Sequence, residues 1–403
     1  MLKHIRNPIL RTFIVLGLIT FIAVIAIAYG RGYRFTKDET GNNIVAGTGL
    51  LVMTSTPDGA RAFIDDELST ATDDTINLKP GKYTVRIEKD GYFPWKKEIE
   101  ITNEQVTETN ALLFPKAPQL TSLTTTGVTN PVMDKEKQLI VYTVASASSE
   151  LNGIYAMNLN RGIIPIGDIK RQIASNLIDT FSDSIIEVSP DGSQILSTIY
   201  PVGSGSARTY ILNTTEFNPS PLLVTARANQ IRDEWKLEAE ALIDEKIKSL
   251  SRGAQGIIND YFTNPVFSPE KDKVVYIASS SATLPLVIKP SLPSTNSTPE
   301  SRNIIEGNMY IYNIKDDRNY LLQPKNESEF PEFTWHPDNR HLYFIESGRI
   351  NAIEYDGKNT TTVYAGPFIG NFLAPSPDGT GIVILTGFND PSIPPNLYRL
   401  IFK

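Results

Sequence analysis

The sequence predicts a mainly β protein, with an N-terminal transmembrane helix, a small β-sandwich and a β-propeller of about five to six four-stranded blades carrying one helical insertion. Three observations predict this architecture. A turn phrase flanked by apolar residues recurs through the C-terminal part of the chain, a strand-only segment precedes it, and a long apolar run lies near the N-terminus. Recurrence at a spacing of about 40 residues is typical of propellers and other repeat arrays.

The clearest copy of the turn phrase is Ser189-Pro190-Asp191-Gly192, between two apolar runs. Proline fixes φ at the second position of a tight turn, and Asp and Gly accept the remaining turn geometry. Each copy therefore predicts two strands of one hairpin. Further copies lie at 265–276, 333–344 and 374–385, with a degenerate first copy at 130–142.

A third strand is predicted downstream of each copy, where aromatic and aliphatic residues alternate. These segments are 153–159, 208–213, 308–314, 349–355 and 396–402, and fourth strands follow at 318–322 and 361–364. The last unit lacks one strand, so we expect residues 119–124 to pair with 397–402 and close the ring.

An uninterrupted apolar run, Thr12 to Ala28, predicts a helix that crosses the lipid bilayer, since about 20 apolar residues are needed. The alternative is a cleaved signal peptide, because Ala26-Ile27-Ala28 resembles a cleavage site. The apolar core of a signal peptide usually has about 7–15 residues, which favours a retained anchor. We expect a short basic cytoplasmic tip and an extracytoplasmic body, although basic residues flank both ends of the run.

The predicted domain boundaries follow from these elements. They are 1–30 for the tip and anchor, 31–48 for a linker, 49–115 for the sandwich and 118–403 for the propeller, with a helical insertion at 222–252 and a flexible loop at 290–302.

Four linked motifs of the strand-only segment carry a family resemblance. They are 55–60 (Ser-Thr-Pro-Asp-Gly-Ala), 64–66 (Ile-Asp-Asp), 78–85 (Leu-Lys-Pro-Gly-Lys-Tyr-Thr-Val) and 89–92 (Lys-Asp-Gly-Tyr). Together they resemble the PEGA domain, with Asp58 in place of the glutamate of the family name. The resemblance implies a small β-sandwich of cell-envelope proteins with no catalytic residues of its own.

The repeated turns from Pro118 onward resemble those of TolB-like propellers, whose blades carry a similar Ser-Pro-Asp-Gly turn. Each copy is a weak match, and the repetition gives the resemblance its weight. It implies a propeller fold for this part of the chain.

Composition and motifs point away from several functions. The net charge of −7 argues against nucleic acid as the main partner, and the absence of cysteine excludes disulfides and thiolate sites. We found no nucleotide-binding glycine motif, no hydrolase nucleophile elbow and no zinc-protease motif, so no cofactor, metal or catalytic residue is predicted. His336 and His341 flank one blade turn, and turn structure is favoured over a metal or acid–base role.

Two groups of residues are candidate binding sites. Tyr92, Phe93 and Trp95 either fill the core of the small module or form an exposed patch that stacks on glycan rings. Ile231 and Trp235 open the apolar stripe of the helical insertion. We expect that helix outside the blade core, packed on its own blade or docked to another protein.

These observations predict a membrane-anchored envelope protein that acts as a non-enzymatic binding or scaffold module. Its partner would be a cell-surface polymer, such as a cell-wall glycan, or another envelope protein. The alternative is an envelope carbohydrate hydrolase or lyase with its site at the propeller mouth, because sequence alone cannot exclude a carboxylate pair assembled in space.

Overall fold

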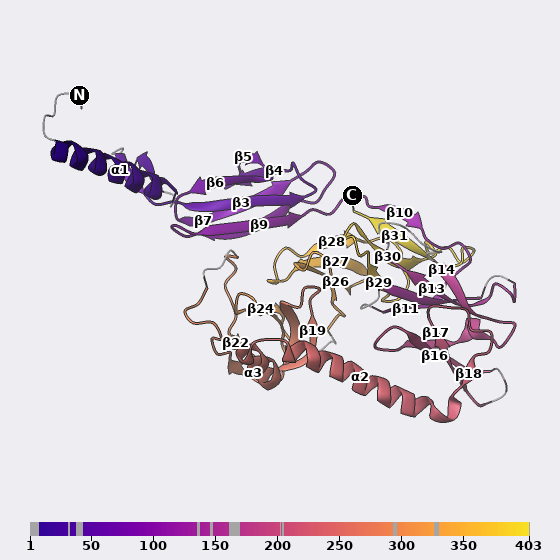
Figure 1. Cartoon of the computed structure of the whole chain (residues 1–403). Helices are drawn as coiled ribbons and strands as arrows, with labels where there is room; N and C mark the ends of the chain where they lie inside the picture. The colour runs from indigo at the N-terminus through magenta and orange to yellow at the C-terminus, as the bar shows by residue number, and fades with distance from the viewer. Residues whose placement is uncertain are drawn as a thin grey trace. The chain divides into compact units, whose positions relative to one another are not determined.

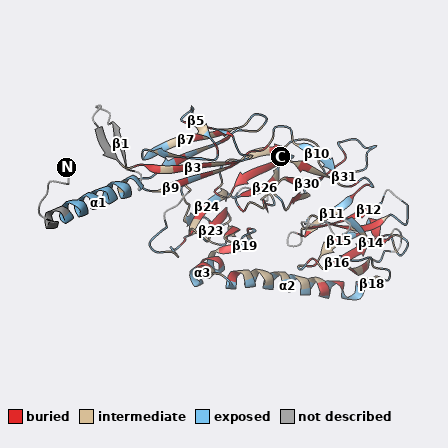
Figure 2. Ribbon diagram, turned by 45° about the horizontal axis from the view of Figure 1, so that its top comes forward, coloured by how far each residue is buried: buried red, intermediate tan, exposed pale blue. Residues whose placement is uncertain are grey.

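The computed structural model describes residues 8–30, 33–37, 43–134, 138–145, 148–160, 170–201, 203, 205–292, 296–325 and 330–402 (Figure 1). The chain divides into two compact units, 1–113 with 290–299, and 114–289 with 300–403. Helix α1 (Pro8–Gly30) contains the predicted apolar run. The side chains described along it are exposed except for Ala28, which is half-buried (Figure 2), as expected for a helix that needs an apolar surrounding.

The predicted linker at 31–48 contains secondary structure. Strands β1 (Arg34–Lys37) and β2 (Asn43–Ala46) pair as an antiparallel hairpin. The Tyr33 hydroxyl, just before β1, donates a hydrogen bond to Glu104 Oε1 at 2.7 Å. The polar composition of this segment therefore did not reveal a hairpin.

Two sheets form the sandwich. One has the order β6-β3-β9, with β3 and β9 parallel, and the other is antiparallel with the order β5-β4-β7-β8. The strands are β3 (Gly49–Thr56), β4 (Arg61–Ile64), β5 (Glu67–Ala71), β6 (Asp74–Leu78), β7 (Gly81–Glu88), β8 (Trp95–Ile101) and β9 (Val106–Leu112). Strand β5 was not predicted, because it is an almost fully exposed edge strand without alternating apolar residues.

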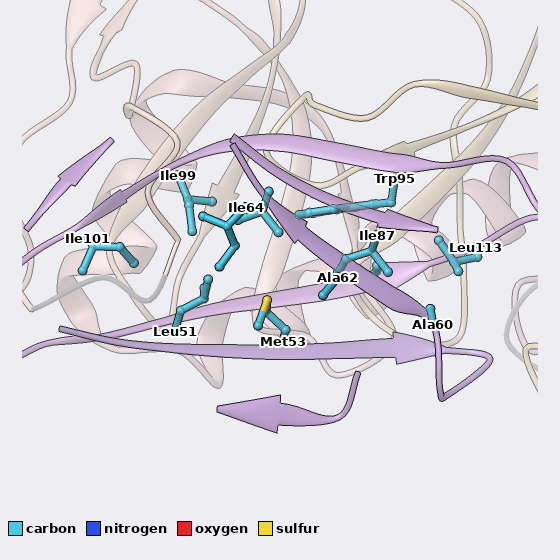
Figure 3. Packing of buried hydrophobic residues seen from close by; sticks show 12 residues of the cluster. Leu51, Met53, Ala60, Ala62, Ile64, Ile87, Trp95, Ile99, Ile101 and Leu113 are labelled. Carbon is cyan, nitrogen blue, oxygen red and sulfur yellow. The ribbon is translucent and has the colours of Figure 1, made fainter. Parts of the chain in front are cut away.

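The sandwich core lies between these two sheets (Figure 3). Leu51 and Met53 on β3 face Val85 and Ile87 on β7, and all four are fully buried. The period-two pattern read from the sequence therefore points its apolar side inward, as it must where one face of each sheet is solvated.

Five four-stranded antiparallel sheets follow in the described part of residues 118–403, as expected for propeller blades. We number them in chain order. Blade 1 is β11 (Thr129–Asp134), β12 (Leu139–Val144), β13 (Gly153–Asn158) and β14 (Lys170–Ser175); blade 2 is β15 (Ile185–Val188), β16 (Gln194–Ile199), β17 (Arg208–Asn213) and β18 (Leu222–Leu223); blade 3 is β19 (Phe262–Phe267), β20 (Lys273–Ala278), β23 (Met309–Asn313) and β24 (Arg318–Gln323); blade 4 is β25 (Thr334–Trp335), β26 (His341–Glu346), β27 (Arg349–Glu354) and β28 (Thr361–Tyr364); blade 5 is β29 (Leu373–Pro375), β30 (Gly381–Thr386), β31 (Asn396–Ile401) and β10 (Gln119–Ser122).

The ring closes as predicted. Strand β10 pairs with β31, with Gln119 opposite Ile401 and Ser122 opposite Tyr398. Behind this pair, Thr124 Oγ1 donates to Asn396 Oδ1 at 2.9 Å and accepts from the Leu397 amide at 2.9 Å. Apolar residues of blades 1 and 5 share one core cluster, so the ends of the propeller sequence are joined by strand pairing and packing.

The repeated turns share one backbone geometry. In four of them the amide of the fourth residue donates to the carbonyl of the first, from Gly192, Lys271, Asn339 and Gly379 at 2.8–3.1 Å. All four donors have φ between 60° and 66°, the left-handed region that favours Gly and Asn. This requirement explains why the phrase could be found from sequence.

The helical insertion is larger than predicted. A 3₁₀ turn (Thr225–Arg227), α2 (Ala228–Lys248) and α3 (Arg252–Tyr261) separate blades 2 and 3, whereas Leu222–Leu223 is the fourth strand of blade 2. We expected one helix, packed on its own blade or docked to another protein, and the two helices pack against blades 2 and 3.

On blade 2, alternate residues of β16 point in opposite directions. Ile195 and Ile199 pack in the cluster shared with blade 1, whereas Leu196 packs with Ile231 of α2. Trp235 packs against the same small cluster. The start of α2 therefore covers the face of blade 2 that points away from blade 1.

On blade 3, Val274 and Tyr276 pack with Ile247 of α2 and Ile258 of α3. The opposite face of this blade, which includes Val275, packs with blade 4. The end of α2 and all of α3 therefore cover the face that points away from blade 4. In Figure 1, α2 extends from β18 of blade 2 to α3, beside blade 3.

A second insertion interrupts blade 3 between β20 and β23. It contains the two-residue strands β21 (Ala282–Thr283) and β22 (Asn303–Ile304), which pair with each other. We predicted a flexible loop at 290–302, but its end is held in place: Arg302 pairs with buried Asp317 at 3.1 Å and with Glu300 at 3.1 Å. Residues 293–295 of this loop lie outside the described residues.

Candidate functional site

The largest cavity that we consider lies at the inner edges of blades 1 and 5 and has a volume of about 600 Å³. Its walls are residues 128–133, along the innermost strand of blade 1, and 369–373, which lead into the innermost strand of blade 5. Glu332, Leu385 and Pro395 complete the lining. We call this cavity the central pocket.

The lining of the central pocket is mainly apolar. Val132, Met133, Phe372 and Leu373 lie among its residues, and Ile369 is 42% exposed. Among the described residues that line it, Glu332 is the one acidic residue. A pocket of this kind suits an apolar group, with Glu332 and nearby amides able to orient it.

A four-residue motif shapes the wall of this pocket. Thr-Asn-Pro-Val occurs at 129–132 on β11 and again at 263–266 on β19. In both strands the register shifts between Thr and Val, and Asn130 and Asn264 have φ of 48° and 51°. A bulge with proline disrupts the regular edge of an inner strand, so that edge is a poor template for adding another strand. The repeated Thr-Asn-Pro-Val is visible in the sequence, but the turn phrase that defines the blades does not include it, so it was not predicted as a feature of the inner strands.

A buried group of ionisable side chains surrounds the blade 4 turn. His341 Nδ1 lies 2.7 Å from Asp338 Oδ2, and the amides of Arg340 and His341 donate to Asp338 Oδ1 at 2.8 and 3.0 Å. The Asp338 amide donates to His336 Nδ1, and His336 Nε2 contacts the Gly379 carbonyl of the blade 5 turn at 3.2 Å.

Burial and charge act in opposite directions on this group. Burial alone would raise the pKa of Asp338, but the charge of His341 and the hydrogen bond from its ring lower it strongly. Burial would lower the pKa of His341, but the Asp338 carboxylate outweighs this and raises it. Both histidine rings are buried, at 3% and 4% exposure. The group therefore holds the turn and joins blades 4 and 5, which agrees with the predicted turn role of these histidines.

The predicted binding residues lie in different environments. Trp95 is 5% exposed and belongs to the sandwich core, whereas Tyr92 and Phe93 are half-buried. Ile231 is 6% exposed and Trp235 is half-buried, both against blade 2. Trp95 therefore packs in a core, and Ile231 packs within the chain. A binding role for these five residues stays a prediction.

Within the described residues, one helix, Thr12–Gly30, is long and apolar enough to cross a membrane, and none of it is buried by the chain. Such a helix near the N-terminus is consistent with either a signal sequence or an anchor. Among the same residues, no cluster of three or more histidine or acidic side chains is placed to hold a metal ion.

Comparison with known proteins supports the first module. The model of the PEGA domain family matches residues 48–116, so the sandwich is a PEGA domain. No curated protein matches the chain in sequence.

Solved structures of similar fold include propellers. Putative TolB from Agrobacterium tumefaciens is 14% identical, with 68% of this chain and 71% of that chain covered and a TM-score of 0.21. TolB from Acinetobacter baumannii is 13% identical, with 79% and 59% covered and a TM-score of 0.22. The propeller domain of the Trilobed protease from Pyrococcus furiosus is 12% identical, with 88% and 95% covered and a TM-score of 0.22. At these TM-scores the likeness carries no argument about function, and the blade assignment rests on strand order.

Proposed function

We propose that the chain is a membrane-anchored, non-enzymatic binding protein of the cell envelope, with its PEGA domain and propeller outside the cytoplasm. The observation that carries this proposal is the apolar helix Thr12–Gly30, none of which is buried, followed by two compact β modules. A tethered chain of this kind positions a binding surface at a membrane without needing chemistry of its own.

The central pocket is the proposed binding site, and its lining favours a protein partner that inserts an apolar side chain. Apolar pockets with a few polar groups bind mostly apolar ligand surface. Glycan cleavage usually needs two carboxyl groups on opposite sides of the scissile bond, whereas the described residues that line this pocket include one, that of Glu332. This difference favours binding over the alternative of a hydrolase or lyase.

Photo-crosslinking in intact cells tests the site. A photoreactive amino acid replaces Ile369, which lines the pocket and is 42% exposed. The matched control carries it at Ile305, which is 59% exposed and is not a lining residue of this pocket. We expect a discrete protein adduct from position 369 that is absent from position 305.

Mass spectrometry of the adduct separates the remaining outcomes. A glycan adduct at position 369 would mean that the pocket binds a cell-wall polymer. Equal labelling at the two positions, or none at position 369, would contradict the pocket as the binding site.

A further inference from the structure

The middle of α2 is exposed although its two ends are buried. Ile231 near its start and Ile247 near its end are 6% and 8% exposed. Between them, residues 236–241 are exposed except for Ala239, which is half-buried, and Leu237 is 66% exposed. The helix is therefore supported at both ends and not in the middle.

Water reaches the middle of α2 from more than one side. Residues two apart on an α-helix point about 200° away from each other around the axis. Glu238 and Glu240 are two residues apart, and both are exposed. If blades 2 and 3 closed around the helix at this point, one of the two would be buried.

The sequence of this segment suits an unsupported helix. Residues 236–241 are Lys-Leu-Glu-Ala-Glu-Ala, all strong helix formers. The start of α2 is attached to blade 2 by hydrogen bonds as well as by packing. Arg232 donates to Glu187 of β15 from Nε at 2.8 Å and from Nη2 at 2.6 Å. An isolated helix of this length is marginal in water, so these end contacts are needed to keep it folded.

We infer that α2 is a rigid spacer that takes the place of direct packing between blades 2 and 3 and keeps that sector of the ring open to solvent. Its 21 residues span about 31 Å at 1.5 Å per residue. The open sector is then a side entrance to the ring. It is distinct from the central pocket, which lies between blades 1 and 5.

Cysteine labelling tests whether the sector is open. The chain has no cysteine, so Glu238→Cys and Glu240→Cys each introduce a single reactive thiol. In the full-length protein in detergent, we expect both to react with a polyethylene glycol maleimide as fast as they do in denaturant. Ala228→Cys, at a position 5% exposed, is the protected control. Protection of either glutamate position would show that the blades close on the helix.

Distance measurement tests whether the helix is the spacer. Spin labels at Leu222→Cys on blade 2 and Ile305→Cys in the blade 3 insertion should give one narrow distance distribution. In the same labelled chain, Ala239→Gly with Ala241→Gly weakens the helix where nothing supports it, and we expect the narrow peak to be lost. A Glu240→Gln chain, which keeps a helix former there, should retain it.

A second label pair controls for general loosening. Leu151→Cys on blade 1 and Ile393→Cys on blade 5 span the closing seam, so their distance should be the same in both backgrounds. An unchanged narrow peak between blades 2 and 3 in the double-glycine chain would overturn the spacer role. If circular dichroism shows that this chain does not fold, the labelling result decides the inference.

Discussion

The ring closure provides a stability test that can be worked out atom by atom. Asn396 is 6% exposed and accepts hydrogen bonds from Thr124 Oγ1 at 2.9 Å and from the Gly127 amide at 3.1 Å. Asn396→Ala removes the acceptor and leaves both donors unpaired in a buried site. An unpaired buried polar group costs about 1–3 kcal/mol, so two cost about 2–6 kcal/mol. We expect a loss near the middle of this range, about 4 kcal/mol.

Thermal unfolding followed by circular dichroism measures this loss. For a unit of this size, 1 kcal/mol lowers Tm by about 2–4 °C, so the propeller transition should fall by about 8–16 °C. Asn371→Ala is the matched control, because Asn371 is exposed at the rim of the central pocket. A Tm of Asn396→Ala within about 2 °C of this control, less than 1 kcal/mol, would refute the view that these contacts hold the ring closed.

Three further predictions concern other parts of the chain. The free energy of unfolding should be highest between about pH 4 and 6.5, the unfolded-state pKa values of Asp and His. Below this range, stability falls because the Asp338 carboxylate, whose pKa is lowered by folding, becomes protonated. Above this range, stability falls because the His341 imidazolium, whose pKa is raised by folding, loses its proton. Denaturant titrations carried to pH values above this range should show a fall in stability on the alkaline side that His341→Asn reduces, and an equal slope in both proteins would contradict this assignment. Asp317→Ala removes one of the carboxylates that pair with the buried guanidinium of Arg302 and the acceptor of the Val287 and Ile288 amides, so we expect a loss of about 3–5 kcal/mol and faster proteolysis within 284–302; wild-type cleavage rates would argue against it. Trp95→Ala should cost about 3–5 kcal/mol in the PEGA domain, whereas Phe93→Ala, at a half-buried position, should cost clearly less; equal losses would mean that Trp95 is not the core residue we describe.

Much of the fold could be predicted because the turns impose a residue requirement. A left-handed fourth position with proline two residues earlier leaves a visible phrase, and each copy marks a hairpin of one blade. The closing strand followed from counting: the last unit had three strands, and 119–124 had strand character. These inferences needed only local geometry.

The place of the helical insertion could not be predicted in the same way. An apolar stripe containing Ile231 and Trp235 shows that one face must be covered, but it does not say by what. We assumed that every blade face is covered by a neighbouring blade, and the structure shows two faces covered by α2 and α3. Helix α3 itself escaped notice because Gly253 and Gly256 interrupt a short segment.

The candidate site was harder still to predict. The central pocket combines residues 128–133 with 369–373, which are far apart in sequence and meet only because the ring closes. Of the aromatic residues that drew attention, Trp95 belongs to the sandwich core. Composition marks residues that must leave water, and both cores and binding sites satisfy that condition.

The state of the N-terminal helix tests the central claim most directly. Membranes from cells that produce the full chain are washed with alkaline carbonate, and the N-terminus of the retained protein is determined by mass spectrometry. A retained anchor predicts an intact Thr12–Ala28 segment in the washed membranes, and protease added to intact cells should then remove the body and leave a short N-terminal fragment. A soluble protein that begins just after Ala28, or a body protected until the cells are lysed, would contradict the account.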